Sequence, residues 1–216
     1  MSTTEISLAI ETAISGGSLA ILENGEILAT SVGQQSRSRA EDILIELDHL
    51  LSGNHVNKHD ISKIFVSAGP GSFTGIRIGV ATAKGLARAL AIDLKPVSLL
   101  ESLAAAAATD GKLAVVLFVG REAYCFQVFE RTAETMTSIG APQVVAAKDL
   151  MSLPRNLGIG SIVYLNEQSD DNLKLLFESS TAKPVPITSS PAEAIGIAAG
   201  SAAISLDVAP LFLSKP

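Results

Sequence analysis

Two histidines have a spacing that could hold a metal ion on a helix. His55 and His59 stand at positions i and i+4, which would place both imidazoles on one helical face. Their setting, residues 53–60 (GNHVNKHD), is polar and begins with glycine, so it is typical of a connection between a helix and a strand. The third histidine, His49, falls among polar positions of the preceding segment. We therefore expect solvated histidines and no metal site.

Candidate nucleophiles are few. Ser72, in GPGSF, lacks the G-x-S-x-G spacing of a nucleophile elbow. Cys125 is the only cysteine and lies between two aromatic residues in an apolar strand pattern, which favours a packed, unreactive thiol. A single cysteine also excludes an internal disulfide and a multi-cysteine zinc site. We expect no catalytic residue of the protease kind, and any base would have to come from the first quarter of the chain.

Residues 68–87, AGPGSFTGIRIGVATAKGLA, follow an apolar strand and open into a helix. Residues 69–71 form a turn that needs backbone freedom, and Ser72 or Thr74 can cap the helix by accepting a backbone N–H. Free amides at the helix start could also hold an anion, because the helix dipole is positive there. The segment is not a P-loop, because Gly75 is followed by Ile-Arg rather than by Lys and Ser or Thr.

Three glycines of this segment lie on one helical face. Gly71, Gly75 and Gly79 recur at intervals of four, so no side chain holds another backbone away from that face. The face can pack closely against the protein's own sheet or against a subunit partner, and the residues alone leave both open. We expect the partner, so that replacing Gly75 or Gly79 with Leu would abolish a dimer and change the melting temperature only modestly.

The elements that position these residues alternate between strands and helices. Apolar alternation and an Asn-Gly turn predict an antiparallel meander, and apolar spacings of three and four predict an amphipathic helix. The first half is predicted to contain strands at residues 6–10, 19–22 and 27–32, a helix at 38–51, a strand at 64–67, a helix ending near 90, and a segment at 96–100 that leads into an alanine-rich helix.

The second half begins again with strands. They are predicted at residues 113–119, 124–129 and 134–139, and the chain is predicted to end in a helix over residues 191–206. A meander followed by α/β elements thus occurs twice, which indicates an α/β fold with two lobes, each a mixed sheet with flanking helices, as in the actin-like ATPase (ASKHA) superfamily. We divide the chain into an N-terminal lobe, residues 1–105, and a smaller C-terminal lobe, residues 106–216.

Composition narrows the classes of function. Hydrophobic residues make up 47% and charged residues 18% of the 216 residues, which leaves apolar surface for another subunit to cover. The formal net charge of -6 repels phosphate backbones, so we expect no strong direct binding of nucleic acid by this chain alone. No segment approaches the roughly 20 apolar residues of a membrane span, and the first residues lack a secretion signal. We expect a cytoplasmic protein.

A resemblance to a known family rests on the glycine-rich segment. GPGSFTGIRIG followed by ATAKGLA resembles the hallmark of the TsaB (YeaZ) family. The opening SLAIETAISGGSLAILENGEI, the helix EDILIELDHLL and the terminal APLFL agree with it, and the second half matches only weakly. The resemblance implies an actin-like fold and a partnership with a catalytic homologue, TsaD, whose transferase makes threonylcarbamoyladenosine beside the anticodon of tRNA.

The resemblance also shows where catalytic chemistry is missing. In the catalytic homologue a histidine pair flanking a glutamate holds the metal after the glycine-rich helix. Leu99 and Leu103 stand at the matching positions, and leucine offers no lone pair to a metal ion. Glu101 is retained, and we expect it on the helix surface or in a capping role. The resemblance therefore implies no catalytic residue and no metal in this chain.

The sequence also gives only weak support for a nucleotide-binding site. Glu11 and Thr12 occupy the position where the actin-like superfamily usually has Asp before a small or hydroxyl residue, and the longer Glu could displace the water network of a metal. Residues 158–161 (GIGS) could form a phosphate-approaching turn, although an isolated G-x-G is a weak signal. We expect no resident cofactor, and we leave open a weak ATP or ADP site linked to the interface with the partner.

The chain departs from the TsaB pattern in two places. Arg39 stands where members tend to carry a histidine shortly before the glutamate of the first helix, here Glu41. Residues 118–124 (FVGREAY) lack the aspartate of an Asp-Ala-Arg segment that members tend to have before Glu-x-Tyr. These departures weaken a surface or nucleotide role for those residues and leave a scaffold role unaffected.

The resemblance implies an accessory, non-catalytic subunit of the complex that forms N6-threonylcarbamoyladenosine in tRNA. The expected partners are a TsaD-type homologue, other complex members such as a TsaE-type ATPase, and a second copy of the chain when the partner is absent. A small ATPase or kinase of the same superfamily, or a glycoprotease-like peptidase, are the alternatives. Residues assigned to the partner interface are Gly71, Ser72, Thr74, Gly75, Arg77, Gly79 and Lys84.

Overall fold

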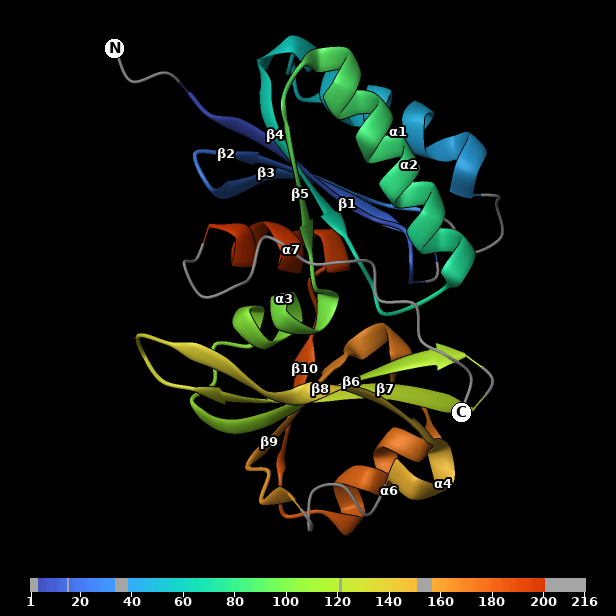
Figure 1. The fold of residues 1–216 in the computed structure, drawn as a ribbon, viewed down its shortest axis with the longest axis vertical. Helices are drawn as coiled ribbons and strands as arrows, with labels where there is room; N and C mark the ends of the chain where they lie inside the picture. The colour runs from blue at the N-terminus through green and yellow to red at the C-terminus, as the bar shows by residue number, and fades with distance from the viewer. Residues whose placement is uncertain (1–3, 15, 34–38, 121, 151–156, 201–216) are drawn as a thin grey trace.

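The protein consists of two stacked lobes, each built around a five-stranded sheet (Figure 1). The computed structural model describes residues 4–14, 16–33, 39–120, 122–150 and 157–200. Along these ranges, no helix is both long enough and apolar enough to cross a membrane.

The first sheet combines an antiparallel meander with two parallel strands. Its strands are β1 (Ile6–Glu11), β2 (Ser18–Glu23), β3 (Glu26–Val32), β4 (Ile61–Ser67) and β5 (Asp93–Val97), in the order β3-β2-β1-β4-β5. The predicted hairpin is confirmed, because Asn24 and Gly25 both adopt positive φ angles, 53° and 87°, in the turn between β2 and β3. The strand β4 runs parallel to β1 and β5, as the intervening helices require.

Helices cover both faces of this sheet. On the outer face lie α1 (Arg39–Gly53), which leads into the short η1 (Lys58–Asp60), and α2 (Phe73–Leu90). On the face toward the second lobe lie α3 (Leu99–Ala106) and α7 (Pro191–Ala199). Alternation along β1 serves both faces, because Leu8 and Ile10 belong to the cluster under α1 and α2 while Ala9 belongs to the cluster between the lobes.

The second sheet repeats the plan of the first. Its strands are β6 (Gly111–Gly120), β7 (Ala123–Arg131), β8 (Met136–Ala146), β9 (Ser161–Leu165) and β10 (Lys183–Ile187), in the order β10-β9-β6-β7-β8. A meander, β6 to β8, is again followed by two parallel strands. The short elements α4 (Ala147–Leu150) and η2 (Asn166–Gln168) and the helix α6 (Asp171–Ser179) complete this lobe. The repetition confirms the predicted duplicated α/β fold.

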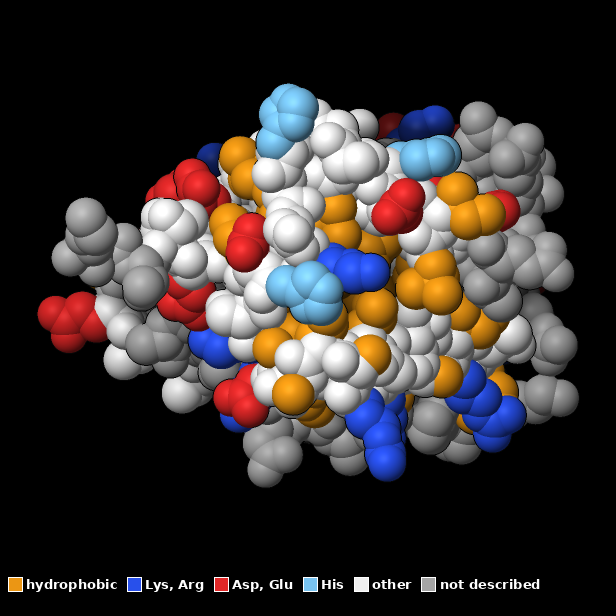
Figure 2. Space-filling view, turned by 90° about the horizontal axis from the view of Figure 1, so that it is seen from above, with side chains coloured by type: hydrophobic (Ala, Val, Ile, Leu, Met, Phe, Trp, Pro, Cys, Tyr) orange, Lys and Arg blue, Asp and Glu red, His pale blue; other side chains and the backbone are white. Residues whose placement is uncertain are grey.

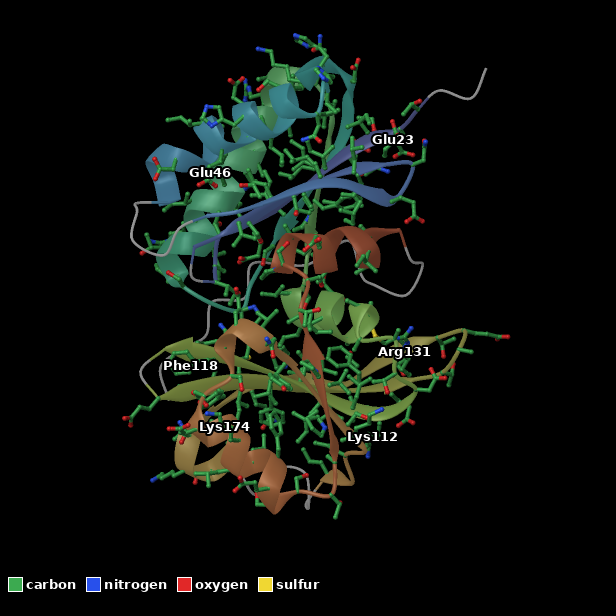
Figure 3. The ribbon with its side chains drawn as sticks, turned by 180° about the vertical axis from the view of Figure 1, so that it is seen from behind. Glu23, Glu46, Lys112, Phe118, Arg131 and Lys174 are labelled. Atoms are coloured by element: carbon green, nitrogen blue, oxygen red, sulfur yellow. The ribbon has the colours of Figure 1, made fainter. Side chains whose placement is uncertain are left out.

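The two lobes share one apolar core. Both α3 and α7 lie between the sheets (Figure 1), and a single cluster contains side chains from β2, α3, β6, β7 and α7. Arg131, at the end of β7 (Figure 3), adds a polar link because its guanidinium donates to the carbonyl of Ala105, 3.2 Å away.

The helix α7 packs on the first sheet, although it follows the strands of the second sheet in the sequence. The boundary predicted at residue 105 falls inside α3. The helix α7 belongs to the predicted C-terminal lobe, residues 106–216, but packs on β1 and β2 of the first sheet. The amide of Ala192, in the first turn of α7, donates to Ser18 Oγ on β2 at 3.0 Å. Residues 201–206 of the predicted terminal helix lie outside the described residues.

A candidate partner-binding face around the glycine-rich helix

A serine begins the glycine-rich helix. The side chain of Ser72 caps α2 by accepting from the amide of Gly75 at 3.2 Å, and its own amide donates to the carbonyl of Ala13 at 2.7 Å. The capping role predicted for Ser72 is thus confirmed, whereas Thr74 lies exposed in the first turn. A hydroxyl that caps its own helix is already engaged, which gives no support to a role for Ser72 as a nucleophile.

Three amides around the start of α2 are used by the chain itself. Those of Ser72 and Gly75 are engaged as just described, and the amide of Ile76 donates to the carbonyl of Ser72 at 2.9 Å. An anion site at a helix start needs several amides that point at the ligand. These contacts therefore lend no support to the anion site that the helix start suggested.

The glycine face of α2 packs against the end of β1. A Cβ atom added at Gly75 would lie 2.0 Å from the carbonyl oxygen of Thr12, and one added at Gly79 would lie 2.2 Å from Thr12 Oγ1. At Gly71 the added atom would lie 2.6 Å from the carbonyl oxygen of Ala13. The hydroxyl of Thr12 also donates to the carbonyl of Gly75 at 2.7 Å.

The expectation that these three glycines face a partner was therefore wrong. Gly75 and Gly79 are buried, and the space beside them is filled by the chain's own backbone. The sequence analysis did not identify Thr12 as the residue that holds α2. Its only sequence signal was a hydroxyl residue at the end of a buried strand.

Glu11 stabilises the turn that carries Thr12. Its side chain is buried at the end of β1, and Oε1 accepts from the amides of Ala13 and Ile14, the latter at 3.0 Å. The two amide donors offset part of the cost of burying this polar side chain. Glu11 thus serves the fold at the position where a nucleotide-binding relative would carry its acidic residue.

The stretch after β5 is apolar where the resemblance places metal ligands. Leu99 and Leu103 are completely buried in the core between the lobes. Ser98 caps α3 by accepting from the amide of Glu101 at 3.4 Å, and Glu101 is partly exposed in the first turn, as predicted. Among the described residues, no group of three His, Cys, Asp or Glu side chains is placed to hold a metal ion.

The histidines lie on α1, in the turn that follows it and on η1. His55 adopts a φ angle of 56° in the turn after α1, and His59 belongs to η1, so the two do not share a helical face. Both are exposed, as is His49 on α1. The predicted polar connection between a helix and a strand is confirmed.

The GIGS turn predicted at residues 158–161 joins strands. The amide of Gly160 donates to the carbonyl of Lys112 on β6, and its carbonyl accepts from the amide of Lys183 on β10, each at 2.8 Å. Because the amide of Gly160 donates to the carbonyl of Lys112, it is not available to donate to a phosphate. The turn extends the second sheet.

The thiol of Cys125 is packed, as predicted. Cys125 is fully buried on β7, and burial raises the pKa of its thiol from 9.0 to about 12. Burial also raises the pKa of the neighbouring Tyr124 from 10.0 to about 12, with a further contribution from the hydrogen bond that its hydroxyl donates to Asp170. Neither group is an activated nucleophile at neutral pH.

We expect the protein to lose stability in alkali through these two groups. Both stay protonated in the folded state above the pH at which they ionise in the unfolded chain. Their contribution is therefore complete below about pH 9 and falls as the pH rises toward 12. Urea unfolding between pH 8 and 11.5 measures this loss.

Cys125→Ala serves as the comparison for this prediction, because it removes the thiol and should flatten the fall above pH 9. The wild-type thiol should also react with an alkylating reagent only after unfolding. Rapid labelling of the native protein at pH 8 would contradict a buried thiol.

The outer side of α2 offers polar contacts. Thr74, Arg77 and Lys84 are exposed there, in the positions expected for the rim of an interface. The guanidinium of Arg77 lies over the ring of Phe73, with Cζ 3.7 Å from the ring centroid. Large exposed apolar side chains also occur on the two outer helices, at Leu44, Ile45 and Phe73. The exposed face of α1 and α2 therefore remains a candidate for partner binding, without the glycines.

Comparison with known proteins agrees with this fold. A family model described as TsaD, tRNA N6-adenosine threonylcarbamoyltransferase, matches residues 26–204. The tRNA threonylcarbamoyladenosine biosynthesis protein TsaB of Bacillus subtilis is 38% identical over 98 residues, which cover 45% of this chain and 43% of that protein. The TsaB protein of Haemophilus influenzae is 33% identical over 101 residues, covering 46% and 42%. The matched region thus spans less than half the length of these curated relatives.

A solved structure extends the likeness to nearly the whole fold. It is described as an uncharacterized protein with similarity to peptidase YEAZ from Pseudomonas aeruginosa, and it superposes with a TM-score of 0.71 at 21% identity, covering 97% of this chain and 100% of that one. The two matches to TsaB proteins and this superposition confirm the resemblance to TsaB (YeaZ). Since the family model accounts for most of the sequence, the chain belongs to the TsaD family, within which it is similar to the TsaB (YeaZ) proteins.

Proposed function

We propose that this chain is an accessory, non-catalytic subunit in the formation of N6-threonylcarbamoyladenosine in tRNA, acting through a complex with a TsaD-type catalytic homologue. The observation that carries the proposal is the apolar stretch after β5. Leu99 and Leu103 fill the core between the lobes at the positions where the resemblance places the metal-binding histidines. A subunit built in this way contributes binding surface and leaves the transfer to its partner.

The rival enzymatic functions have less support. An ATPase or kinase needs an acidic residue free to organise magnesium, whereas Glu11 accepts two backbone amides of its own turn. A peptidase needs an activated nucleophile, whereas Ser72 caps a helix and Cys125 is buried. The proposal also includes weak binding of ATP or ADP at the interface with the partner, and a TsaE-type ATPase as a further member of the complex.

The face of α1 and α2 is the proposed binding surface. Two such helix pairs can pack as a bundle across an interface. Thr74, Arg77 and Lys84 would lie at its rim, and the same surface would serve a twofold homodimer when the partner is absent. The net charge of -6 indicates that tRNA is bound by the complex rather than by this chain alone.

Reconstitution tests the proposal. The purified chain, its TsaD-type homologue from the same organism, and both together are incubated with tRNA and a threonylcarbamoyl donor, and modified adenosine is measured by mass spectrometry of digested tRNA. We expect no product with this chain alone and a large gain when it is added to the homologue.

Two results would argue against the proposal. Modification by this chain alone, at the rate of the pair, would make it the enzyme. A homologue that neither binds this chain nor gains activity from it would exclude the accessory role.

A further inference from the structure

An apolar groove lies between the two outer helices. It has a volume of about 330 Å³, within the range of about 300 to 1,000 Å³ that is typical of pockets for small ligands. Leu44 and Leu47 line it from α1, and Leu86 and Leu90 line it from α2. Leu8 of β1 also lines the groove, so the first sheet closes it from below.

The inside of the groove suits an alkyl chain. The rest of its apolar lining is aliphatic as well, with Leu51, Ile61, Ile64 and Ala89. Among the described residues that line the groove, none has an aromatic ring, a hydroxyl or an amide in its side chain, so a planar polar ligand has no ring to stack on. Leu44 and Leu51 stand seven residues apart on α1, about 10 Å along the helix axis, so the groove is long enough for an extended chain.

The mouth of the groove carries the polar groups. Lys58 and His59 on η1 and Asp48 on α1 line it, and all three residues are exposed. In the view from above (Figure 2), Lys and His side chains lie beside hydrophobic ones on this face of the protein. Within the described part of the chain, neither Lys58 nor Asp48 takes part in an ion pair. The Lys58 ammonium can therefore meet the charge of a ligand without breaking an existing pair.

We infer that the groove binds an aliphatic carboxylate, with its alkyl chain between α1 and α2 and its carboxylate at Lys58 and His59. Both of these side chains offer N–H donors, whereas the Asp48 carboxylate only accepts. An anionic head group thus has two partners at the mouth, and a cationic one has a single partner. The alkyl chain would also cover Leu44, which is 52% exposed. The inference concerns the chain by itself and does not rest on the proposed function.

Titration calorimetry of the purified full-length chain tests the ligand class. Hexanoate, octanoate and decanoate are compared below the concentrations at which they form micelles. We expect the affinity to rise about fourfold for each CH₂ group that becomes buried. Decyltrimethylammonium, which has the same chain length as decanoate and a positive head group, should bind more weakly than decanoate.

Variants of the groove and its mouth test the location of the site. Leu44→Asp should weaken decanoate binding about tenfold, because it removes an apolar wall and adds a repelling charge. The matched control is Leu175→Asp on α6, where Leu175 is 50% exposed. Lys58→Gln should weaken binding about two- to fivefold and Asp48→Asn should strengthen it, whereas Lys148→Gln on α4 should change nothing. Salt at about 0.5 M should reduce both charge effects. Circular dichroism checks that each variant is folded.

Four results would overturn the inference. A wild-type chain that binds none of the three carboxylates has no such site, and an affinity independent of chain length would show that the alkyl chain is not buried. Tighter binding of decyltrimethylammonium than of decanoate would reverse the assigned head group. Equal affinities of Leu44→Asp and Leu175→Asp would place the site outside the groove. None of these results bears on the accessory role, which the reconstitution with the homologue tests separately.

Discussion

Gly75→Ala should lower the free energy of unfolding by about 3 kcal/mol, at the upper end of the cost of overpacking. The added Cβ atom would lie 2.0 Å from the carbonyl oxygen of Thr12 and 3.0 Å from Cα of Ala13, and both are backbone atoms that cannot rotate away. Moving α2 away from β1 to relieve this clash would also disturb the hydrogen bond that Thr12 Oγ1 donates to the carbonyl of Gly75 at 2.7 Å. Urea unfolding followed by circular dichroism gives the change directly.

Gly85→Ala provides the control in the same helix. An added Cβ atom at Gly85 has no other atom within 4 Å, and the residue is exposed. Alanine at an exposed helix position should raise stability by about 0.5 to 1 kcal/mol, because it restricts the unfolded chain. The two variants should therefore shift the midpoint in opposite directions. Equal midpoints, or loss of a dimer from Gly75→Ala without loss of stability, would restore the view that the glycines face a partner.

Introducing both histidines by Leu99→His/Leu103→His should destabilise the protein by more than any surface change and should not create a metal site. The two leucines are completely buried in the core between the lobes, so imidazoles there would replace apolar contacts and lose hydration. Each buried polar group without a partner costs about 2 to 7 kcal/mol, depending on the reference state. A protein of ordinary stability, about 5 to 15 kcal/mol, would then be largely unfolded.

Leu175→His is the matched control for this pair, because Leu175 is exposed on α6 and should accept histidine with little change. Circular dichroism and zinc binding at pH 7 are measured for each variant. A double variant that stays folded and binds zinc tightly would show that this position retains a latent catalytic site. It would then weaken the main support for a non-catalytic subunit.

Local features of the fold were predictable because they depend on neighbouring residues. The Asn24-Gly25 turn required positive φ angles, and the structure has them. The cap at Ser72 follows from a hydroxyl placed before an apolar helix, and the buried thiol of Cys125 follows from an apolar strand pattern. The duplicated α/β plan followed from the order of the elements, since a meander precedes parallel strands in each half.

Local sequence could not decide what lies against each face. The spacing of Gly75 and Gly79 makes a face that can pack closely against either a partner or the chain itself. In the structure the neighbour is Thr12 of the same chain, which lies 63 residues before Gly75. The return of α7 to the first sheet likewise depends on contacts between segments far apart, such as Ala192 with Ser18. The apolar groove between α1 and α2, with a volume of about 330 Å³, exists because the two helices and the first sheet meet there. Sequence by itself thus determined which elements form and which ligand-bearing residues the chain lacks, whereas tertiary packing decided which helical faces stay exposed, because burial depends on residues distant in the chain.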